Sequence, residues 1–333
     1  MISKKWLLAI GCSGLLAFGV AACGDDDDDD GGSSSNGDLS GDIVIDGSST
    51  VAPLSAPAGE LFKGENPNVN VSVGTSGTGG GFEKFCAGET DISDASRPID
   101  EEEEVPVCEE NGIEFEELVV ANDALTVVVN PENPVTCMTV DQLNQIFDPK
   151  ATITSWGDID GLDADFSEDL DIYSPGADSG TFDYFTDAIN GEEGAQRSQD
   201  VNIVGENDNQ TVTGVAGSTG GIGYFGYSFF QENQDQLKAL EIENEDGDCV
   251  APSPEATQDG SYNPLGRQLF IYPSAEALQR PEVSAFVEFY INNSDTLTEQ
   301  AGFIAMTDEQ KQGSLDQAAA LAGGGGGAAE ETE

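Results

Sequence analysis

A repeated succession of strand, polar turn and helix is the sequence feature that most restricts the fold of this chain. Residues 43–46 and 69–73 have the β-branched pattern of strands, and a helix is expected over 50–63, with Pro53 in its first turn. The same succession recurs: further strands are expected at 91–94, 125–129 and 171–173, and further helices at 82–85, 140–147 and 182–189. This order predicts an α/β fold built on a mostly parallel sheet.

Four of the turns in this pattern are rich in serine, threonine and glycine. They are GSST at 47–50, GTSGTGGG at 74–81, ASR at 95–97 and DSGT at 178–181. In an α/β sheet such turns gather beyond the carboxyl ends of the strands, where ligands bind. The first turn of a helix offers unpaired N–H groups and a partial positive charge, and Arg97 adds a guanidinium. Helix capping alone would explain one such turn, but four together predict a cradle for a tetrahedral oxyanion.

Charge and composition exclude several classes of function. The chain has 64 acidic and 11 basic residues, and its formal net charge of −53 argues against binding to nucleic acid. It contains no histidine, which excludes Ser-His-Asp and Cys-His catalysis and histidine metal sites. P-loop and nucleophile-elbow motifs are absent, and Phe82 stands where a dinucleotide-binding loop needs its last glycine. An enzyme built from this sequence would therefore have to use carboxylates, lysine, tyrosine or a metal held by carboxylates.

Both ends of the chain are expected to lie outside the folded part. Residues 1–22 have the character of a secretory signal peptide, and VAAC at 20–23 matches a lipobox, in which Cys23 becomes lipid-modified. An ordinary signal peptide followed by a chance cysteine is the alternative. Residues 23–40 and 321–333 have the composition of an acidic Gly/Ser linker and a disordered tail. Calcium binding by the aspartates at 25–30 stays open, although calcium ligands need a loop that makes them converge.

The folded part of the chain contains four cysteines, apart from Cys12 in the leader and Cys23. They are Cys86, Cys108, Cys137 and Cys249. None of them has the C-x-x-C spacing of a zinc or redox site, and an exported protein meets an oxidising environment. Two disulfides are therefore expected, with three pairings open.

Taken together, the motifs at these turns resemble those of PstS, the phosphate-binding proteins of high-affinity ABC phosphate importers. The resemblance covers DGSSTVAP at 46–53, the glycine-rich turn through Gly81, residues 91–98 and DSGTF at 178–182. It is closest to the branch of the family that carries SRP and DSGTFDYF, and it continues through GIGYFGY at 221–227 and PLGRQLFIY at 264–272. The combination spans nearly all of residues 41–310 and is far more specific than any single motif.

The resemblance implies a two-lobe periplasmic-binding-protein fold of type 2, in which the chain crosses between the lobes at two hinge crossovers. The crossovers would fall near residues 121–126 and 264–271. Lobe 1 would then be discontinuous, with residues 41–122 and 267–320, and lobe 2 would contain residues 123–266.

This division of the chain favours one of the three disulfide pairings. Cys86 with Cys108 and Cys137 with Cys249 would place one bridge in each lobe, so that neither bridge holds the two lobes together. A bridge between the lobes would impede closure of the hinge. We therefore expect the pairing with one disulfide in each lobe.

The resemblance also implies a function, that of a binding protein without catalytic residues, metal or cofactor. The protein would capture inorganic phosphate between its lobes and deliver it to the permease subunits of an ABC transporter. It would be a monomer, exported and attached by its lipid anchor to the outer face of the bacterial cell membrane. Two alternatives are a receptor for another oxyanion, such as sulfate or molybdate, and an exported phosphohydrolase, which would need a nucleophile and usually metals.

Ligand roles in the family can be transferred position by position to hydroxyl and backbone N–H donors at the starts of helices. They are the hydroxyl of Thr50, the N–H of Val51, Thr78 or alternatively Ser76 in the glycine-rich turn, and Ser179, Gly180 and Thr181 in lobe 2. All of these groups donate hydrogen bonds, as an anion requires.

Two positions depart from the family pattern. The best-studied members have an aspartate where Ser96 stands and an arginine where Pro175 stands. Arg97 is the expected replacement cation, and it would reach the anion from the opposite lobe. The family aspartate accepts the proton of hydrogen phosphate, and a buried acceptor that faces no proton excludes sulfate. Asp178 is the first candidate for this acceptor and Asp46 the second, although an N-cap role explains Asp178 equally well.

Overall fold

The structure, a computed structural model, describes residues 39–177, 179–205 and 207–323. The predicted signal peptide, Cys23, nearly all of the predicted linker, Asp178 and most of the predicted tail lie outside the described residues. Among the helices that the structure describes, none has the length and apolar character needed to cross a bilayer.

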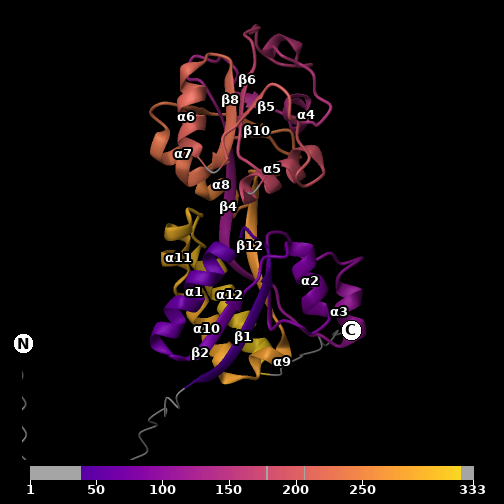
Figure 1. The fold of residues 1–333 in the computed structure, drawn as a ribbon, viewed down its shortest axis with the longest axis vertical. Helices are drawn as coiled ribbons and strands as arrows, with labels where there is room; N and C mark the ends of the chain where they lie inside the picture. The colour runs from indigo at the N-terminus through magenta and orange to yellow at the C-terminus, as the bar shows by residue number, and fades with distance from the viewer. Residues whose placement is uncertain (1–38, 178, 206, 324–333) are drawn as a thin grey trace, which may run out of the picture. The chain divides into compact units, whose positions relative to one another are not determined.

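The secondary structure alternates between strands and helices over most of the chain (Figure 1). The strands are β1 (Ser40–Gly47), β2 (Asn68–Val73), β3 (Ile92–Ala95), β4 (Leu118–Val129), β5 (Cys137–Met138), β6 (Asp171–Ser174), β7 (Val201–Ile203), β8 (Gly221–Gly226), β9 (Lys238–Ala239), β10 (Glu241–Glu243), β11 (Cys249–Val250) and β12 (Gly266–Pro273). The helices are α1 (Ala52–Glu65), α2 (Thr78–Cys86), α3 (Val105–Asn111), α4 (Val140–Phe147), α5 (Gly180–Asn190), α6 (Asp208–Gly217), α7 (Tyr227–Asn233), α8 (Pro254–Gln258), α9 (Ala275–Leu278), α10 (Pro281–Asn292), α11 (Ser294–Ala301) and α12 (Asp308–Ala322), with a 3-10 turn at Trp156–Asp158.

The main sheet has the strand order β2-β1-β3-β12-β4-β8-β6-β7, with β9 paired to β4. Strand β1 is parallel to β2 and to β3 on one side of the sheet, and β6 is parallel to β7 and to β8 on the other. The central strands β12 and β4 are antiparallel to each other and to β3 and β8. The prediction of a mostly parallel sheet is therefore wrong for its centre. The reason is topological, because β4 leads the chain into the second half of the sheet and β12 brings it back.

Each half of the sheet has its own hydrophobic core. The first, which we call the core of lobe 1, combines N-terminal and C-terminal residues such as Ile43 and Phe286. The second, the core of lobe 2, is built largely by the chain between the two central strands. On β4, Ala121 belongs to the core of lobe 1 and Ala124 to that of lobe 2. Strands β4 and β12 are thus the two crossovers between the lobes (Figure 1). The residue boundaries of the lobes stay a prediction.

Local sequence signals account for several of the helices. In α1, Leu54, Ala58 and Phe62 recur at a spacing of four and are buried against the sheet. Helix α4 occupies the predicted residues, because Thr139 and Gln142 form a reciprocal capping box at its start. The predicted helices at 50–63, 82–85 and 182–189 are confirmed as α1, α2 and α5, with boundaries that differ by a few residues.

The predicted disulfide pairing is confirmed. Cys86 at the end of α2 is bonded to Cys108 in α3, and Cys137 on β5 is bonded to Cys249 on β11. The first bridge lies beside the lobe 1 half of the main sheet, and the second joins two strands of the small sheet β11-β10-β5. Neither bridge links the two lobes.

Candidate functional site

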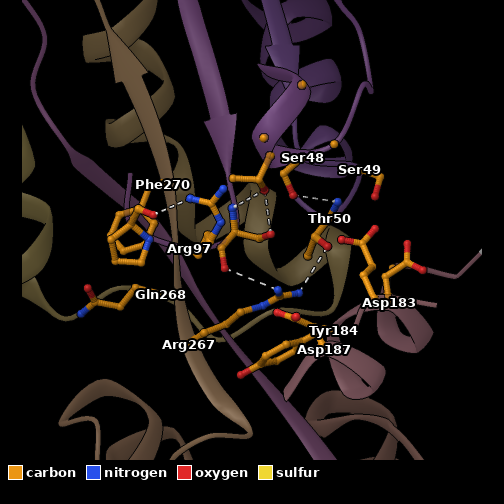
Figure 2. Close-up of a pocket in the computed structure, with 18 of the residues that line it drawn as sticks. Ser48, Ser49, Thr50, Arg97, Asp183, Tyr184, Asp187, Arg267, Gln268 and Phe270 are labelled. Atoms are coloured by element: carbon orange, nitrogen blue, oxygen red, sulfur yellow. Dashed lines mark hydrogen bonds between the residues drawn. The ribbon is translucent and has the colours of Figure 1, made fainter. Parts of the chain in front are cut away.

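A cavity of about 730 Å³ lies where the strand-to-helix turns of both lobes meet (Figure 2). Its lining residues are Ser48, Ser49, Thr50, Ser76, Gly77, Thr78, Gly79, Gly80, Ser96, Arg97, Pro98, Gly180, Asp183, Tyr184, Asp187, Glu193, Pro264, Gly266, Arg267, Gln268 and Phe270. This volume is many times the share of one water molecule in the liquid, which is about 30 Å³. A small tetrahedral anion therefore fits with solvent beside it. All four of the predicted turns contribute at least one residue to the lining.

The turn between β1 and α1 is held tightly against the end of β3. Gly47 has a φ of 142°, and a Cβ there would lie 2.1 Å from the carbonyl oxygen of Asp94, so only glycine fits. The N–H of Ser48 donates to the same oxygen at 2.8 Å. The N–H of Val51 donates to the carbonyl of Ser48 at 3.2 Å, so this predicted anion donor already has a partner. Thr50, in contrast, presents its side chain to the cavity.

The glycine-rich turn offered two alternative ligands, and the geometry favours Thr78. Ser76 donates its N–H and its hydroxyl to Oδ1 of Asp46, at 3.0 and 2.8 Å, so its hydroxyl hydrogen is already used. The hydroxyl oxygens of Thr78 and Ser96 lie 3.1 Å apart, and the Thr78 oxygen also accepts the N–H of Ser96 at 3.2 Å. One of these two hydroxyls can donate to the other while the remaining hydrogen points to a ligand.

The start of α5 approaches the start of α1 at this cavity. A Cβ placed on Gly180 would lie 3.1 Å from the hydroxyl oxygen of Thr50. The first N–H groups of a helix have no partner within it, and both helix dipoles add partial positive charge at this point. Ser179 and Thr181 flank Gly180 but do not line the cavity with it. Asp178, the first candidate for the proton acceptor, lies outside the described residues.

Arg97 lines the cavity, but its guanidinium is already paired. Its two terminal nitrogens donate to the two carboxylate oxygens of Glu104, at 2.8 and 2.7 Å, and one of them also donates to the carbonyl of Pro98 at 2.9 Å. The hydrogen bond to Glu104 is the main reason that the pKa of Arg97 is raised. Arg97 thus lies at the cavity with its charge neutralised by a neighbouring acid, and its contact with an anion stays a prediction.

Arg267 is a residue of the cavity wall that the sequence reasoning did not name. It projects from β12 into the cavity, and Figure 2 shows its guanidinium between Thr50 and the ring of Tyr184. Its terminal nitrogens donate to the Thr50 hydroxyl at 3.3 Å and to the Ser96 carbonyl at 3.4 Å, and it pairs with Asp123 at 3.2 Å. The guanidinium carbon lies 3.5 Å from the centroid of the Tyr184 ring. Its place in the family-like stretch 264–272 was the available signal in the sequence.

Three acidic residues also line the cavity, namely Asp183, Asp187 and Glu193. Burial raises the pKa of Asp183, and the charge of Glu193 adds to this effect while Arg267 opposes it. Among the described residues, none donates a hydrogen bond to the carboxylate of Asp183. Such a carboxylate is suited to accept a proton-bearing group of a ligand.

Asp46, the second candidate for the acceptor, is occupied by other partners. It accepts hydrogen bonds from Gly47 and Ser76 on Oδ1 and forms an ion pair with Lys84 through Oδ2. Burial alone would raise the pKa of Asp46, but the hydrogen bonds from Lys84, Ser76 and Gly47 together outweigh burial and lower it. Asp46 therefore shapes the glycine-rich turn, and it does not line the cavity.

A metal site is not suggested by the clusters of possible ligands. Within the part of the chain that the structure describes, one such cluster is found, formed by Cys137, Glu241 and Cys249. The two sulfur atoms in it are joined by the disulfide, so they are not thiolate ligands. The chemistry that the cavity offers is reversible binding of an anion by hydroxyls, N–H groups and arginine.

Comparison with known proteins identifies the family. A model described as "PBP superfamily domain" matches residues 32–294. The chain belongs to the PBP superfamily. It is 45% identical over 266 residues to Protein SphX of Synechococcus elongatus, which covers 79% of this chain and 77% of that protein. It is 37% identical over 324 residues to the phosphate-binding protein PstS of Staphylococcus saprophyticus, covering 94% of this chain and 95% of that protein.

A solved structure agrees with this assignment. The crystal structure of a possible phosphate binding protein from Planctomyces limnophilus has a TM-score of 0.80 and 41% sequence identity to this chain. The match covers 85% of this chain and 99% of that one. The resemblance to the PstS family and the two-lobe periplasmic-binding-protein fold are confirmed, and the family is one of solute-binding proteins.

Proposed function

We propose that this protein binds inorganic phosphate in the cavity between its lobes and delivers it to an ABC permease. The observation that carries the proposal is the convergence of four hydroxyl-rich and glycine-rich turns from both lobes on one cavity. The relatives of this chain include a protein named as phosphate-binding and a solved structure titled as a possible phosphate binding protein. A binding role without catalysis agrees with both the family and the donors in the cavity.

The proposed ligands are donors that can surround a tetrahedral anion from two sides. They are Thr50, Thr78, Ser96 and Arg97 from lobe 1 and, from lobe 2, the hydroxyls of Ser179 and Thr181 with the N–H groups of Gly180 and Thr181. Val51, Ser76 and the N–H of Ser179 would join them only after giving up their present partners, and Arg97 would be shared between the anion and Glu104. Hydrogen bonds from such donors to an anion are about twice as strong as those between neutral groups.

The acidic residues of the cavity favour phosphate over the alternative oxyanions. Near neutral pH hydrogen phosphate carries a proton that a carboxylate can accept, whereas sulfate and molybdate carry none. A carboxylate such as Asp183 therefore attracts the first anion and repels the other two. A phosphohydrolase remains the weaker alternative, because the cluster of possible metal ligands in the described residues is a disulfide with one glutamate.

We also propose that the protein works outside the cytoplasmic membrane as a lipid-anchored monomer. The signal-like residues 1–22 and the lipobox cysteine Cys23 support export and anchoring. The residues between this cysteine and the folded part are rich in Asp, Gly and Ser.

Equilibrium dialysis of the purified protein with radiolabelled phosphate tests the proposed function. We expect one bound phosphate per chain, displaced by arsenate but not by a large excess of sulfate or molybdate. Thr50→Val and Thr78→Val remove hydroxyls at nearly constant shape and should weaken binding, whereas Thr213→Val, on the exposed surface of α6, is the matched control. Failure to retain phosphate, or equal displacement by sulfate, would refute the proposal.

A further inference from the structure

Arg267 occupies a position that no other arginine of the described chain shares. It stands on β12, and its guanidinium contacts the other crossover strand through Asp123 on β4. The same group reaches Thr50 in lobe 1 and the ring of Tyr184 in lobe 2. One positive charge therefore meets both lobes and both crossovers at the cavity.

Resting on the proposed function, we propose that Arg267 is the main cation for the bound anion, and that Asp123 competes with the anion for it. The competition from the Asp123 carboxylate distinguishes this proposal from one in which Arg267 only binds the anion. In the absence of an anion Asp123 neutralises Arg267, and an anion has to share that charge.

The contacts of the two arginines in the cavity support this assignment. Arg97 makes a two-pronged pair with both oxygens of Glu104 at 2.8 and 2.7 Å, which uses the end of its guanidinium formed by Nη1 and Nη2. Arg267 instead directs Nε and Nη2 to a single oxygen of Asp123, both at 3.2 Å. Its remaining contacts, to neutral oxygens at 3.3 and 3.4 Å, are long. An anion can replace these long contacts with shorter, charge-assisted ones.

The surroundings of Arg267 also fix the plane of its guanidinium. The Tyr184 ring lies against it, and the hydroxyl of Tyr184 is held by the carbonyl of Pro264 at 2.7 Å. Thr50 accepts a hydrogen bond from Arg267, so the hydrogen of its own hydroxyl is free to point to a ligand. Arg267 and Thr50 thus form a preoriented pair of donors on one side of the cavity.

Asp123 has the properties of a competing counter-ion. Its side chain is buried, and burial raises its pKa while the charge of Arg267 lowers it. An ionised Asp123 therefore depends on Arg267, and it repels any second negative charge that approaches the same guanidinium. Removal of the Asp123 charge should strengthen anion binding, whereas removal of the Arg267 charge should weaken it.

Titration calorimetry with inorganic phosphate on the full mature protein tests this pair. We expect Arg267→Gln to weaken phosphate binding by on the order of 10- to 100-fold, the usual range for a hydrogen bond to a charged group. Asp123→Asn should tighten binding several-fold or more, as expected for a like charge removed from within several ångström. Arg97→Gln should weaken binding less than Arg267→Gln. Arg280→Gln, at an arginine away from the cavity, is the control for loss of one positive charge.

The double variant Asp123→Asn/Arg267→Gln is the control for misfolding. It leaves no unpaired buried charge at this position, so it should fold even if Arg267→Gln does not. It should unfold at nearly the wild-type temperature and bind phosphate as weakly as Arg267→Gln alone. Wild-type affinity in a folded Arg267→Gln or double variant, or weaker binding by a folded Asp123→Asn, would overturn the inference and leave phosphate binding by the wild type intact. A wild type that binds no phosphate would overturn the proposed function and this inference together.

Discussion

Replacement of Asp183 by Asn tests how the cavity distinguishes phosphate from sulfate. Asp183 lies in the first turn of α5 and lines the cavity with its carboxylate free of hydrogen-bond donors among the described residues. We expect it to accept the proton of hydrogen phosphate. An asparagine can turn its NH₂ group toward an anion, so the variant should bind phosphate somewhat less well and sulfate better.

The expected size of the change follows from the environment of Asp183. Burial and the nearby charge of Glu193 raise its pKa, whereas Arg267 opposes them, so the carboxylate is only partly compensated. One unmatched polar group in such a site costs about 1–3 kcal/mol, which corresponds to a phosphate-to-sulfate ratio that shrinks by roughly 5- to 150-fold. Competition binding at neutral pH, with both anions on the same preparation, measures this ratio directly.

Asp187 provides a matched control for Asp183. It lies one turn further along the same face of α5 and also lines the cavity, so Asp187→Asn makes the same change of charge. General electrostatic repulsion predicts similar effects in both variants, whereas a specific acceptor predicts an effect at Asp183 alone. An unchanged ratio in Asp183→Asn would refute the role of Asp183. A collapse of the ratio in Asp178→Asn instead would return that role to the residue that the sequence first indicated.

Three further predictions concern stability and anchoring. Burial raises the pKa of Asp94 to about 8 against a hydrogen bond from Ser55. The folded state should therefore lose stability as the pH rises from about 4 through 8, by up to roughly 1.4 kcal/mol per unit. In urea unfolding, the free energy of unfolding of Asp94→Asn should depend less on pH than that of the wild type. An equal pH dependence would contradict the raised pKa of Asp94. The disulfide between Cys137 and Cys249 closes 112 residues and the one in lobe 1 closes 22. Replacement of Cys137 and Cys249 by serine should lower the free energy of unfolding by about 5 kcal/mol, and the same change at Cys86 and Cys108 should lower it by about 3 kcal/mol. Equal losses would contradict the loop-entropy argument. Cys23→Ala should release the protein into the medium or leave it unprocessed, and lipid labelling that persists in the variant would refute the lipobox.

Elements with strong local signals could be predicted from the sequence. Helix α4 was predicted at the observed residues because its cap and its apolar spacing lie within a few residues of each other. Strand β4 was predicted only from residue 125, although it begins at Leu118. Its first half contains the buried polar residues Asn122 and Asp123, which interrupt the apolar pattern of a strand. Their partners, Gln310 and Arg267, lie far along the chain, so no local pattern could show that these side chains are satisfied.

The candidate site was predictable to the same degree. The turns rich in hydroxyls and glycine can be recognised from short stretches of sequence. The structure brings Thr50, Thr78 and Gly180 from these turns to one cavity. What the sequence could not show is which donors are already engaged. Ser76 is held by Asp46 across 30 positions, and Arg267 reaches its carboxylate partner across 144. These hydrogen bonds and ion pairs depend on tertiary contacts. They determine which of several chemically similar groups remain available to a ligand.

The negative charge of the protein is compatible with an anionic ligand, because surface charge is screened by salt whereas the groups in the cavity act at contact distance. The net charge of −53 belongs to the whole chain, and at physiological salt surface charges are screened within about 8 Å. Inside the cavity Arg97 and Arg267 are each paired with a carboxylate, and further acidic residues line the wall. The cavity therefore has no large net positive charge. Attraction then comes from groups at contact distance, namely the Arg267 guanidinium that the anion shares with Asp123 and the hydroxyls and N–H groups that the turns present. A site of this kind recognises an anion by its shape and its protons, and an excess of surface acid does not prevent binding.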